Sequence, residues 1–262
     1  MSKVTIEDGK VIDVTEPKVK YCPLFKKHRG IDELNCESVR KNAEFRIERF
    51  GMCNDNRDTR MKDFLSFGVS EMLSLALTEY LIDAAVIAAD GCGTVVLEDP
   101  EIVQGMGGRI SGIIETEPIQ KVVDDIGAEK LLDPKTAKID QFEGVAKAYH
   151  MHYHTIAVTV ANAKDAQEIR DCFGMTTVII AVHTTGISEK DAEILFDTCD
   201  IITSCASKHI REIAKGRALL QAGTKVPVYA ASEMGAKIIK AKLDQLGREP
   251  DTGLDESPEP ML

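Results

Sequence analysis

Short apolar runs alternate, from about residue 69 to residue 246, with stretches in which apolar residues recur every three or four positions. A short apolar run that ends in turn-forming residues is typical of a buried strand, and a three-and-four spacing is typical of an amphipathic helix. The runs predict strands at residues 84–89, 155–160, 177–182, 200–203 and 226–230. The spacing predicts helices at residues 69–82, 164–172, 188–196, 208–214 and 232–246.

Strands that alternate with helices of about ten residues are typical of βαβ units, whose strands run parallel. The sequence therefore predicts an α/β protein with a mostly parallel, Rossmann-like sheet that is flanked by helices. Pro227 removes a hydrogen-bond donor from the last strand, which favours a place at a sheet edge or at a strand start. Residues 92–140 are less regular, and we interpret them as an insertion over the sheet.

The chain outside this repeating pattern forms an N-terminal appendage and a C-terminal tail. Apolar and polar residues alternate over residues 3–14, and Asp8-Gly9 within this stretch is a strong hairpin turn signal. A helix with one apolar face is expected at residues 38–50. The residues after the last helix are acidic and contain proline, and they have no apolar period, so disorder is expected there. The predicted organisation is a hairpin-and-helix appendage at residues 1–60, the α/β core at 61–247 and a disordered acidic tail at 248–262.

The composition is that of an acidic globular protein. Of 262 residues, 32 are Lys or Arg and 43 are Asp or Glu, so the formal net charge is −11. Nucleic-acid phosphates and anionic membrane surfaces repel such a protein, and we expect neither as a partner. No stretch has the ~20 apolar residues that span a bilayer, and the N-terminus lacks the apolar region of a signal peptide, which favours a cytoplasmic protein. None of the seven cysteines forms a Cys-x-x-Cys pair, so in a reducing cytoplasm they are thiols or ligands rather than disulfides.

Polar and nucleophilic residues follow each predicted strand. In open α/β sheets, ligands bind beyond the carboxyl ends of the strands, so these segments are expected to meet at a ligand-binding edge. The alternative is that they are ordinary turns and helix caps, which use the same Ser, Thr, Asp and Gly residues. The segments begin at Asp90, Ala161, His183, Ser204 and Ala231.

Four side chains at this edge are candidates for catalysis. Cys205 precedes a predicted helix whose amino terminus would lower the thiol pKa, and Lys208 adds positive potential, so Cys205 is a candidate nucleophile or metal ligand. His183 is a candidate acid, base or ligand. Asp90 is a candidate for binding a hydroxyl group or a cation. The alternatives are a buried inert cysteine, a hydrogen-bonded structural histidine and an ordinary turn aspartate.

Residues 104–112 are glycine-rich but match neither G-x-G-x-x-G nor the P-loop. Backbone amides there, together with the Arg109 guanidinium, are suited to a phosphate or a carboxylate. A glycine-rich lid without a ligand is the alternative. The expected ligand-binding residues of this segment and of the strand-end loops are Gly105, Gly107, Gly108, Arg109, Ser111, Thr184, Thr185 and Ser207.

Cysteine and histidine side chains raise two possibilities for metal binding. Cys22 and Cys205 are candidate metal ligands, and with Cys53 and Cys92 they are candidates for an iron–sulfur cluster, although no two of the four have motif spacing. Three histidines alternate over residues 150–154. They precede a predicted strand and so lie at the end of the sheet away from the expected site, which favours a solvated loop.

Five motifs occur in one order between about Lys10 and Gly235. They are Tyr21-Cys22-Pro23-Leu24-Phe25, Asp63-Phe64-Leu65-Ser66-Phe67-Gly68-Val69-Ser70-Glu71, Gln104-Gly105-x-Gly107-Gly108-Arg109-Ile110-Ser111-Gly112, Ala181-Val182-His183-Thr184-Thr185-Gly186, and Cys205-Ala206-Ser207-Lys208 with Ile210-Arg211-Glu212. With these motifs the chain resembles the methanogenesis marker protein 8 family of methanogenic archaea. Cys22 and Cys205 fall within the family-like motifs, whereas Cys92 stands where the family allows a small apolar residue.

The resemblance implies an oxygen-free archaeal cytoplasm and a role in methanogenesis, and it carries over no catalytic residue. The implied function is maturation or activation of methyl-coenzyme M reductase or of its nickel tetrapyrrole, through a metal, a cluster or a small anionic ligand at the strand-end loops. The implied partner is methyl-coenzyme M reductase or its activation machinery. Two alternatives stay open, namely an enzyme that acts on a small anionic metabolite through Cys205 or His183, and a non-catalytic assembly factor.

Overall fold

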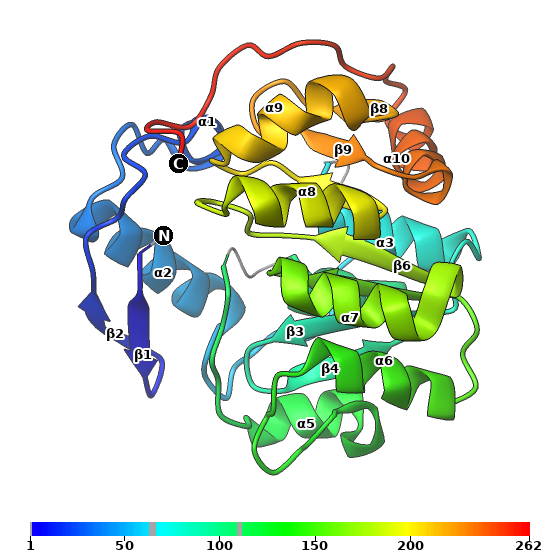
Figure 1. Cartoon of the computed structure of the whole chain (residues 1–262). Coiled ribbons are helices and arrows are strands. Elements are labelled where there is room, and N and C mark those ends of the chain that lie inside the picture. The colour runs from blue at the N-terminus through cyan, green and yellow to red at the C-terminus, as the bar shows by residue number, and fades with distance from the viewer. Residues whose placement is uncertain (1, 63–66, 109–111) are drawn as a thin grey trace.

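The computed structural model describes residues 2–62, 67–108 and 112–262, and it has helices on both faces of a central sheet (Figure 1). The predicted strands are confirmed, and the short strands β4 and β8 are additions to them. The sheet order is β4-β3-β5-β6-β7-β9-β8. The strands are β3 (Ala84–Ala89), β4 (Gly93–Leu97), β5 (Ile156–Val160), β6 (Thr177–Ala181), β7 (Ile201–Thr203), β8 (Leu220–Ala222) and β9 (Val228–Ala230).

The sheet is mixed rather than mostly parallel. Strands β3, β5, β6 and β7 pair in parallel, whereas β4 is antiparallel to β3, and β9 is antiparallel to both β7 and β8. The prediction of a mostly parallel sheet is therefore wrong at both edges. Only residues 90–92 separate β3 from β4, and so short a connection permits antiparallel pairing alone. Because β9 runs in the reverse direction, the segment that begins at Ala231 does not lie at the carboxyl ends of the parallel strands. It lies at their amino ends, away from the other strand-end loops.

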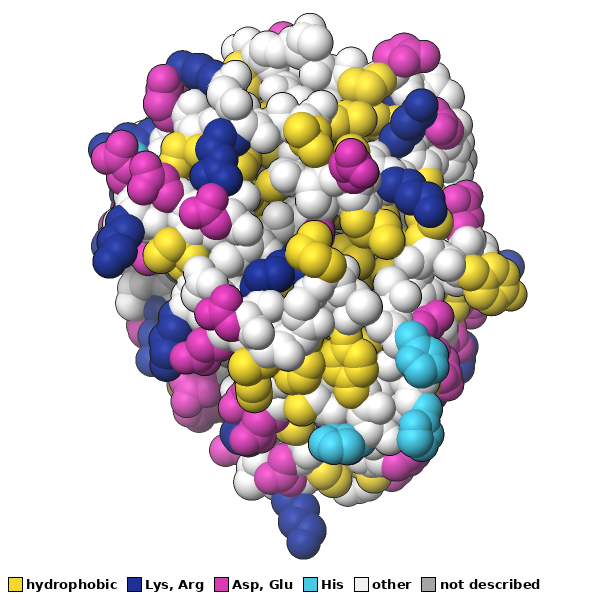
Figure 2. Space-filling model, turned by 45° about the vertical axis from the view of Figure 1, so that its right-hand side comes forward, with side chains coloured by type: hydrophobic (Ala, Val, Ile, Leu, Met, Phe, Trp, Pro, Cys, Tyr) yellow, Lys and Arg dark blue, Asp and Glu magenta, His cyan; other side chains and the backbone are white. Residues whose placement is uncertain are grey.

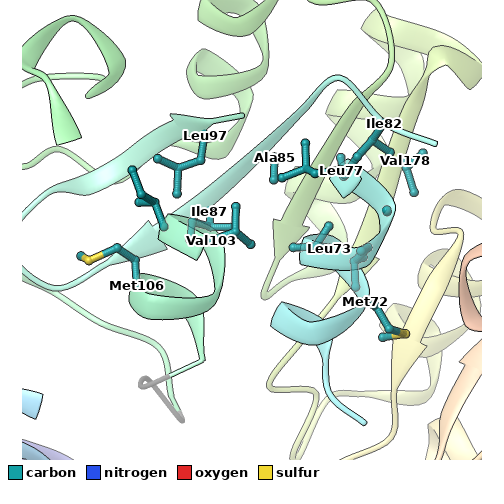
Figure 3. Packing of buried hydrophobic residues seen from close by; sticks show 14 of the residues in the cluster. Met72, Leu73, Leu77, Ile82, Ala85, Ile87, Leu97, Val103, Met106 and Val178 are labelled. Atoms are coloured by element: carbon teal, nitrogen blue, oxygen red, sulfur yellow. The ribbon is translucent and has the colours of Figure 1, made fainter. Parts of the chain in front are cut away.

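Aliphatic side chains join the helices to the sheet. Helices α3, α4, α5 and α10 pack on one face. Figure 3 shows part of this cluster, in which Val103 of α4 lies beside Ile87 of β3 and Leu73 belongs to α3. Helices α6 to α9 pack on the other face. No helix in the described ranges is long and apolar enough to cross a membrane. The helices are α3 (Val69–Thr78), α4 (Pro100–Gly107), α5 (Gln120–Ile126), α6 (Gln141–His150), α7 (Ala163–Phe173), α8 (Glu189–Thr198), α9 (Lys208–Arg217) and α10 (Glu233–Gln245), with short 3-10 turns at Ala128–Lys130 and Gly174–Thr176.

The N-terminal appendage lies at the carboxyl ends of the central strands (Figure 1). It contains the predicted hairpin and the predicted helix α2. This helix begins at Cys36 because the Asn35 side chain accepts a hydrogen bond from the Ser38 amide at 2.9 Å. An apolar cluster that includes Val11 and Ile47 joins the hairpin to α2. The elements are β1 (Val4–Glu7), β2 (Lys10–Val14), α1 (Pro23–Arg29) and α2 (Cys36–Phe50).

The acidic tail, residues 248–262, runs from α10 back to the appendage and ends beside α1 (Figure 1). Glu259 and Tyr21 form a backbone pair, with N–H···O distances of 2.9 Å in both directions. The Leu262 amide donates to the Ala206 carbonyl at 2.8 Å. The tail was expected to be disordered, and the structure instead holds it at the carboxyl edge of the sheet through backbone hydrogen bonds.

Candidate functional site

His183 and Cys205 follow the neighbouring strands β6 and β7 in an unusual backbone conformation. Their φ angles are 57° and 43°, in the left-handed region that residues with a side chain rarely adopt. Such strain costs about 1–3 kcal/mol and persists at functional sites where the surrounding structure enforces it. The Thr184 hydroxyl donates to a carbonyl of β7 at 2.6 Å, and Thr185 Oγ1 accepts from the Ala206 amide at 3.2 Å. These two hydrogen bonds tie the loop after β6 to β7 and its following loop.

Cys22, from the N-terminal appendage, is near enough to Cys205 for the two thiols to interact electrostatically. Burial raises the pKa of the Cys22 thiol, and the Cys205 thiol acts in the same direction. The backbone amides of Phe25 and Leu24 and the Arg211 guanidinium act in the opposite direction. The structure therefore brings together two thiols and a cation that come from distant parts of the chain.

Cys53 and Cys92 do not join this thiol pair. They lie near Arg57 and Asp90, and burial, followed by the Asp90 carboxylate, raises the pKa of each thiol to about 12. The four cysteines thus do not gather around one iron–sulfur cluster. Within the described ranges, no group of three or more His, Cys, Asp or Glu side chains is placed to hold a metal ion.

The cysteines are expected to react with alkylating reagents in the order of their exposure. Cys172 is exposed, whereas Cys92 and Cys199 are buried, and burial raises the pKa of both to about 12. Because the thiolate is the reactive form, iodoacetamide at pH 8 should modify Cys172 at least about 100-fold faster than Cys92 or Cys199. A time course of peptide mass spectra measures the three rates. Similar rates in the folded protein would contradict the burial of the two slow thiols.

Asp90, a predicted catalytic residue, is a member of a buried ion pair. The Arg57 Nε atom lies 3.1 and 3.0 Å from its two carboxylate oxygens, and the Cys53 amide donates to Oδ2 at 2.8 Å. Arg57 is 0% exposed and Asp90 is 2% exposed. The other Arg57 nitrogens donate to the carbonyls of Asp58 and Met106 at 2.6 and 3.2 Å. This carboxylate fastens the appendage to the end of β3, which accounts for its burial without any ligand.

The glycine-rich segment forms no open anion cradle where the structure describes it. Gly105 and Gly107 lie within α4, whose amides are used by the helix itself, and Gly108 caps its end. A Cβ at Gly105 would overlap the backbone of Thr59, so this glycine allows the chain after α2 to pack against α4. Two further predicted ligand residues lie outside the described ranges: Arg109 and Ser111.

The other predicted residues at this edge differ in their availability. The Ser207 hydroxyl accepts from the Ile210 amide at 3.3 Å and caps α9. The Lys208 side chain is exposed, and its backbone amide donates to the Leu262 carbonyl in the tail at 3.0 Å. Burial lowers the pKa of His183, so its imidazole is neutral at pH 7. The thiol pair and the neutral imidazole therefore remain as the groups available for chemistry at this edge.

Arg211 lies beside both thiols but was not among the predicted catalytic or ligand-binding residues. Its side chain is 6% exposed, and Nη2 donates to the Cys205 carbonyl at 3.1 Å. The sequence contains an indication that Arg211 is buried. Ser207, Arg211 and Ala214 follow each other at helical spacing, which places Arg211 on the buried face of α9. Arg211 belongs to one of the five sequence motifs, which do not show this orientation.

The alternating histidines lie at the opposite edge of the sheet, before β5. His152 and His154 are exposed and line a cavity of about 450 Å³ together with Tyr80 and Tyr153. Figure 2 shows histidine side chains gathered on one face of the molecule. This cavity is thus separate from the thiol pair.

Comparison with known proteins gives the family. A family model described as "uncharacterized protein conserved in archaea" (DUF2099) matches residues 1–244. The chain belongs to this archaeal family. An uncharacterized protein of Methanocaldococcus jannaschii, MJ0054, is 44% identical over 252 residues, which cover 94% of this chain and 89% of that protein. No solved structure matches the chain.

The DUF2099 match covers every part of the thiol site. It includes Cys22 in the appendage as well as Cys205 and Arg211 in the core, whereas the tail lies beyond residue 244. The DUF2099 description agrees with the archaeal setting that the sequence motifs led us to expect.

Proposed function

We propose that this protein is an accessory protein of methanogenesis that binds a metal or a metal cluster through Cys22 and Cys205. Its task would be the maturation or activation of methyl-coenzyme M reductase or of its cofactor. The meeting of the two thiols at the carboxyl edge of the central strands supports the proposal most directly. Ligand sites of open α/β sheets lie at this edge.

The two thiolates of Cys22 and Cys205 are suited to a metal that the protein binds temporarily and then transfers. Thiolates are preferred ligands of soft metal ions and of iron–sulfur clusters. Burial raises the pKa of the Cys22 thiol, and the positive charge of Arg211 opposes this effect. Two thiolates fill only part of a four-coordinate sphere, so the remaining positions are available to groups that travel with the metal. An incomplete sphere suits a protein that passes its metal to a partner.

The methanogenic setting rests on the resemblance of the five sequence motifs to the methanogenesis marker protein 8 family. The relative from Methanocaldococcus jannaschii supports an archaeal setting for the whole chain, because the similarity covers 94% of it. In this setting, the partner that we propose is methyl-coenzyme M reductase or its activation machinery.

Protein purified without oxygen from its native host is expected to contain about one equivalent of iron or nickel, with charge-transfer absorption. Cys22→Ser and Cys205→Ser should each lower the metal content at least about 10-fold, because each removes half of the protein ligands. Elemental analysis, acid-labile sulfide and absorption spectra measure the effect. Cys172→Ser, at an exposed thiol, is the matched control and should keep its metal. A metal-free wild type, or variants that match this control, would disprove the metal-binding role.

The strained backbone at His183 and Cys205 favours a second function, an enzyme that acts on a small anionic metabolite. The Cys205 thiolate would be the nucleophile, and the neutral His183 imidazole would accept a proton. The same set of variants separates the two functions. A metal-free protein that tolerates Cys22→Ser in vivo, but not Cys205→Ser or His183→Gln, would favour the enzyme.

A further inference from the structure

Arg211 is a buried cation that has no carboxylate partner among the described residues. Two other arginines with little or no exposure do have one. Arg57 Nε lies 3.0 Å from Asp90 Oδ2, and Arg170 Nη2 lies 2.7 Å from Asp200 Oδ2. Arg211 is 6% exposed, and its hydrogen bonds go elsewhere. Buried charges in proteins are normally paired, so Arg211 lacks the counter-charge that the other two arginines have.

The hydrogen bonds of Arg211 end on neutral oxygen atoms. Nη2 donates to the carbonyls of Cys205 and Lys225 at 3.1 and 2.9 Å, and Nη1 donates to Ser257 Oγ at 3.0 Å. Nε has no hydrogen-bond partner among the described residues. Buried polar atoms are nearly always hydrogen-bonded, so Arg211 retains a donor that a ligand can use.

Among the described residues, no carboxylate forms an ion pair or a hydrogen bond with Arg211. Burial lowers the pKa of the guanidinium, and the groups that oppose this effect are the phenol of Tyr229 and the thiols of Cys205 and Cys22. Phenols and thiols are neutral at pH 7 in their ordinary state. An oxyanion would supply the missing charge, because a guanidinium N–H forms a strong, charge-assisted hydrogen bond to a carboxylate or phosphate oxygen.

Ser257, the present partner of Arg211 Nη1, belongs to the acidic tail. The tail is held nearby through Glu256, which pairs with Lys225 at 2.7 Å and accepts a hydrogen bond from the Tyr21 hydroxyl. The contact between Ser257 and Arg211 is one hydrogen bond to a neutral hydroxyl. Such a bond is weaker than one between two charged groups, so an oxyanion can displace the hydroxyl.

We propose that Arg211 binds the oxyanion group, a carboxylate or a phosphate, of a small ligand, and that this group replaces Ser257. The proposal uses the ligand-binding edge of the proposed function, but it does not depend on metal binding by Cys22 and Cys205. It gives the bound ligand an orientation, with its anionic end at Arg211 and next to the two thiols.

Isothermal titration calorimetry with inorganic phosphate and with acetate, at constant ionic strength, tests the anion site. We expect saturable binding of about one anion per chain by at least one of the two probes, and the probe that binds identifies the class of oxyanion. Arg211→Gln should weaken binding at least about 10-fold, because the charged pair is lost. Arg217→Gln makes the same change on α9 at an exposed arginine that pairs with Asp197, and it should leave binding unchanged. Absence of saturable binding, or equal losses in both variants, would overturn the proposal.

Ser257→Ala tests whether the anion displaces the Ser257 hydroxyl from Arg211, and it leaves the protein core unchanged. This test remains possible even if the Arg211→Gln variant does not fold. Removal of the competing hydroxyl should tighten anion binding by roughly 3- to 10-fold. Saturating anion should also speed hydrogen exchange at the Glu259 and Leu262 amides, which hold the tail in place. The displacement of Ser257 would be overturned if Ser257→Ala bound the anion no more tightly than the wild type does. It would also be overturned if saturating anion left hydrogen exchange at the two tail amides unchanged.

Metal content and anion binding, measured on the same wild-type preparation, separate this proposal from the proposed function. Anion binding by a wild type without metal would leave the Arg211 site standing and remove the metal role. A wild type that holds metal but binds neither phosphate nor acetate would remove the anion site alone.

Discussion

Arg57→Ala is expected to lower the free energy of unfolding by about 3–5 kcal/mol. The substitution leaves the Asp90 carboxylate buried without its counter-charge, because Arg57 Nε is its ion-pair partner at 3.0 Å. Loss of one member of a buried pair is costly because the other charge stays out of water. Urea unfolding followed by circular dichroism measures the change.

Arg60→Ala is the matched control, three positions along the same segment. Arg60 pairs with Asp99 at 2.7 Å, but its side chain is 53% exposed, so the change should cost less than about 1 kcal/mol. Adding Asp90→Ala to Arg57→Ala should restore part of the lost stability, since the unpaired charge is then gone. If Arg57→Ala and Arg60→Ala cost the same, the buried pair does not stabilise the contact between the appendage and β3.

Gly235→Ala is expected to destabilise the protein by about 3 kcal/mol. Gly235 lies in the first turn of α10, where a Cβ would overlap the Asp200 carbonyl. Asp200 has little freedom to move, because its Oδ2 accepts from Arg170 Nη2 at 2.7 Å and from the Ile179 amide at 2.8 Å. Overpacking against a fixed backbone costs this much because neither element can relax fully. Thermal unfolding measures the loss.

Gly216→Ala, in α9, makes the same change where there is room. No atom lies within 4 Å of a Cβ at this position, so the added methyl only restricts the unfolded chain and favours the helix. The variant is expected to be more stable than the wild type by about 0.5–1 kcal/mol. Effects of the same sign at both glycines would contradict the close contact between α10 and the start of β7.

The centre of the sheet could be predicted because each buried strand there is a continuous aliphatic run, as at residues 84–89. Strand β8 could not, because Leu220–Ala222 is only three residues long and its first two side chains are half-buried. Without β8, nothing in the sequence indicated that β9 is reversed. The contacts of the tail join it to residues far away in the sequence, such as Tyr21 and Lys225, so no local pattern shows them.

Residue type alone located part of the candidate site. Cys22 and Cys205 were candidates because thiols bind metals and attack substrates, and in the structure the two thiols interact electrostatically. Asp90 was a candidate for the same kind of reason, but its partner Arg57 is 33 positions away, where no local pattern shows the pairing. A glycine such as Gly105 suits an anion cradle and a close helix contact equally, so composition could not decide between them.

The meeting of Cys22 with Cys205 also sets the order in which the site is made during translation. Cys22 leaves the ribosome 205 − 22 = 183 residues before its partner. Contacts between such distant residues form late, because a long loop must close first. The nascent chain therefore carries an accessible Cys22 thiol through most of its synthesis. The two thiols can come together only when the chain has folded through β7 and the start of α9.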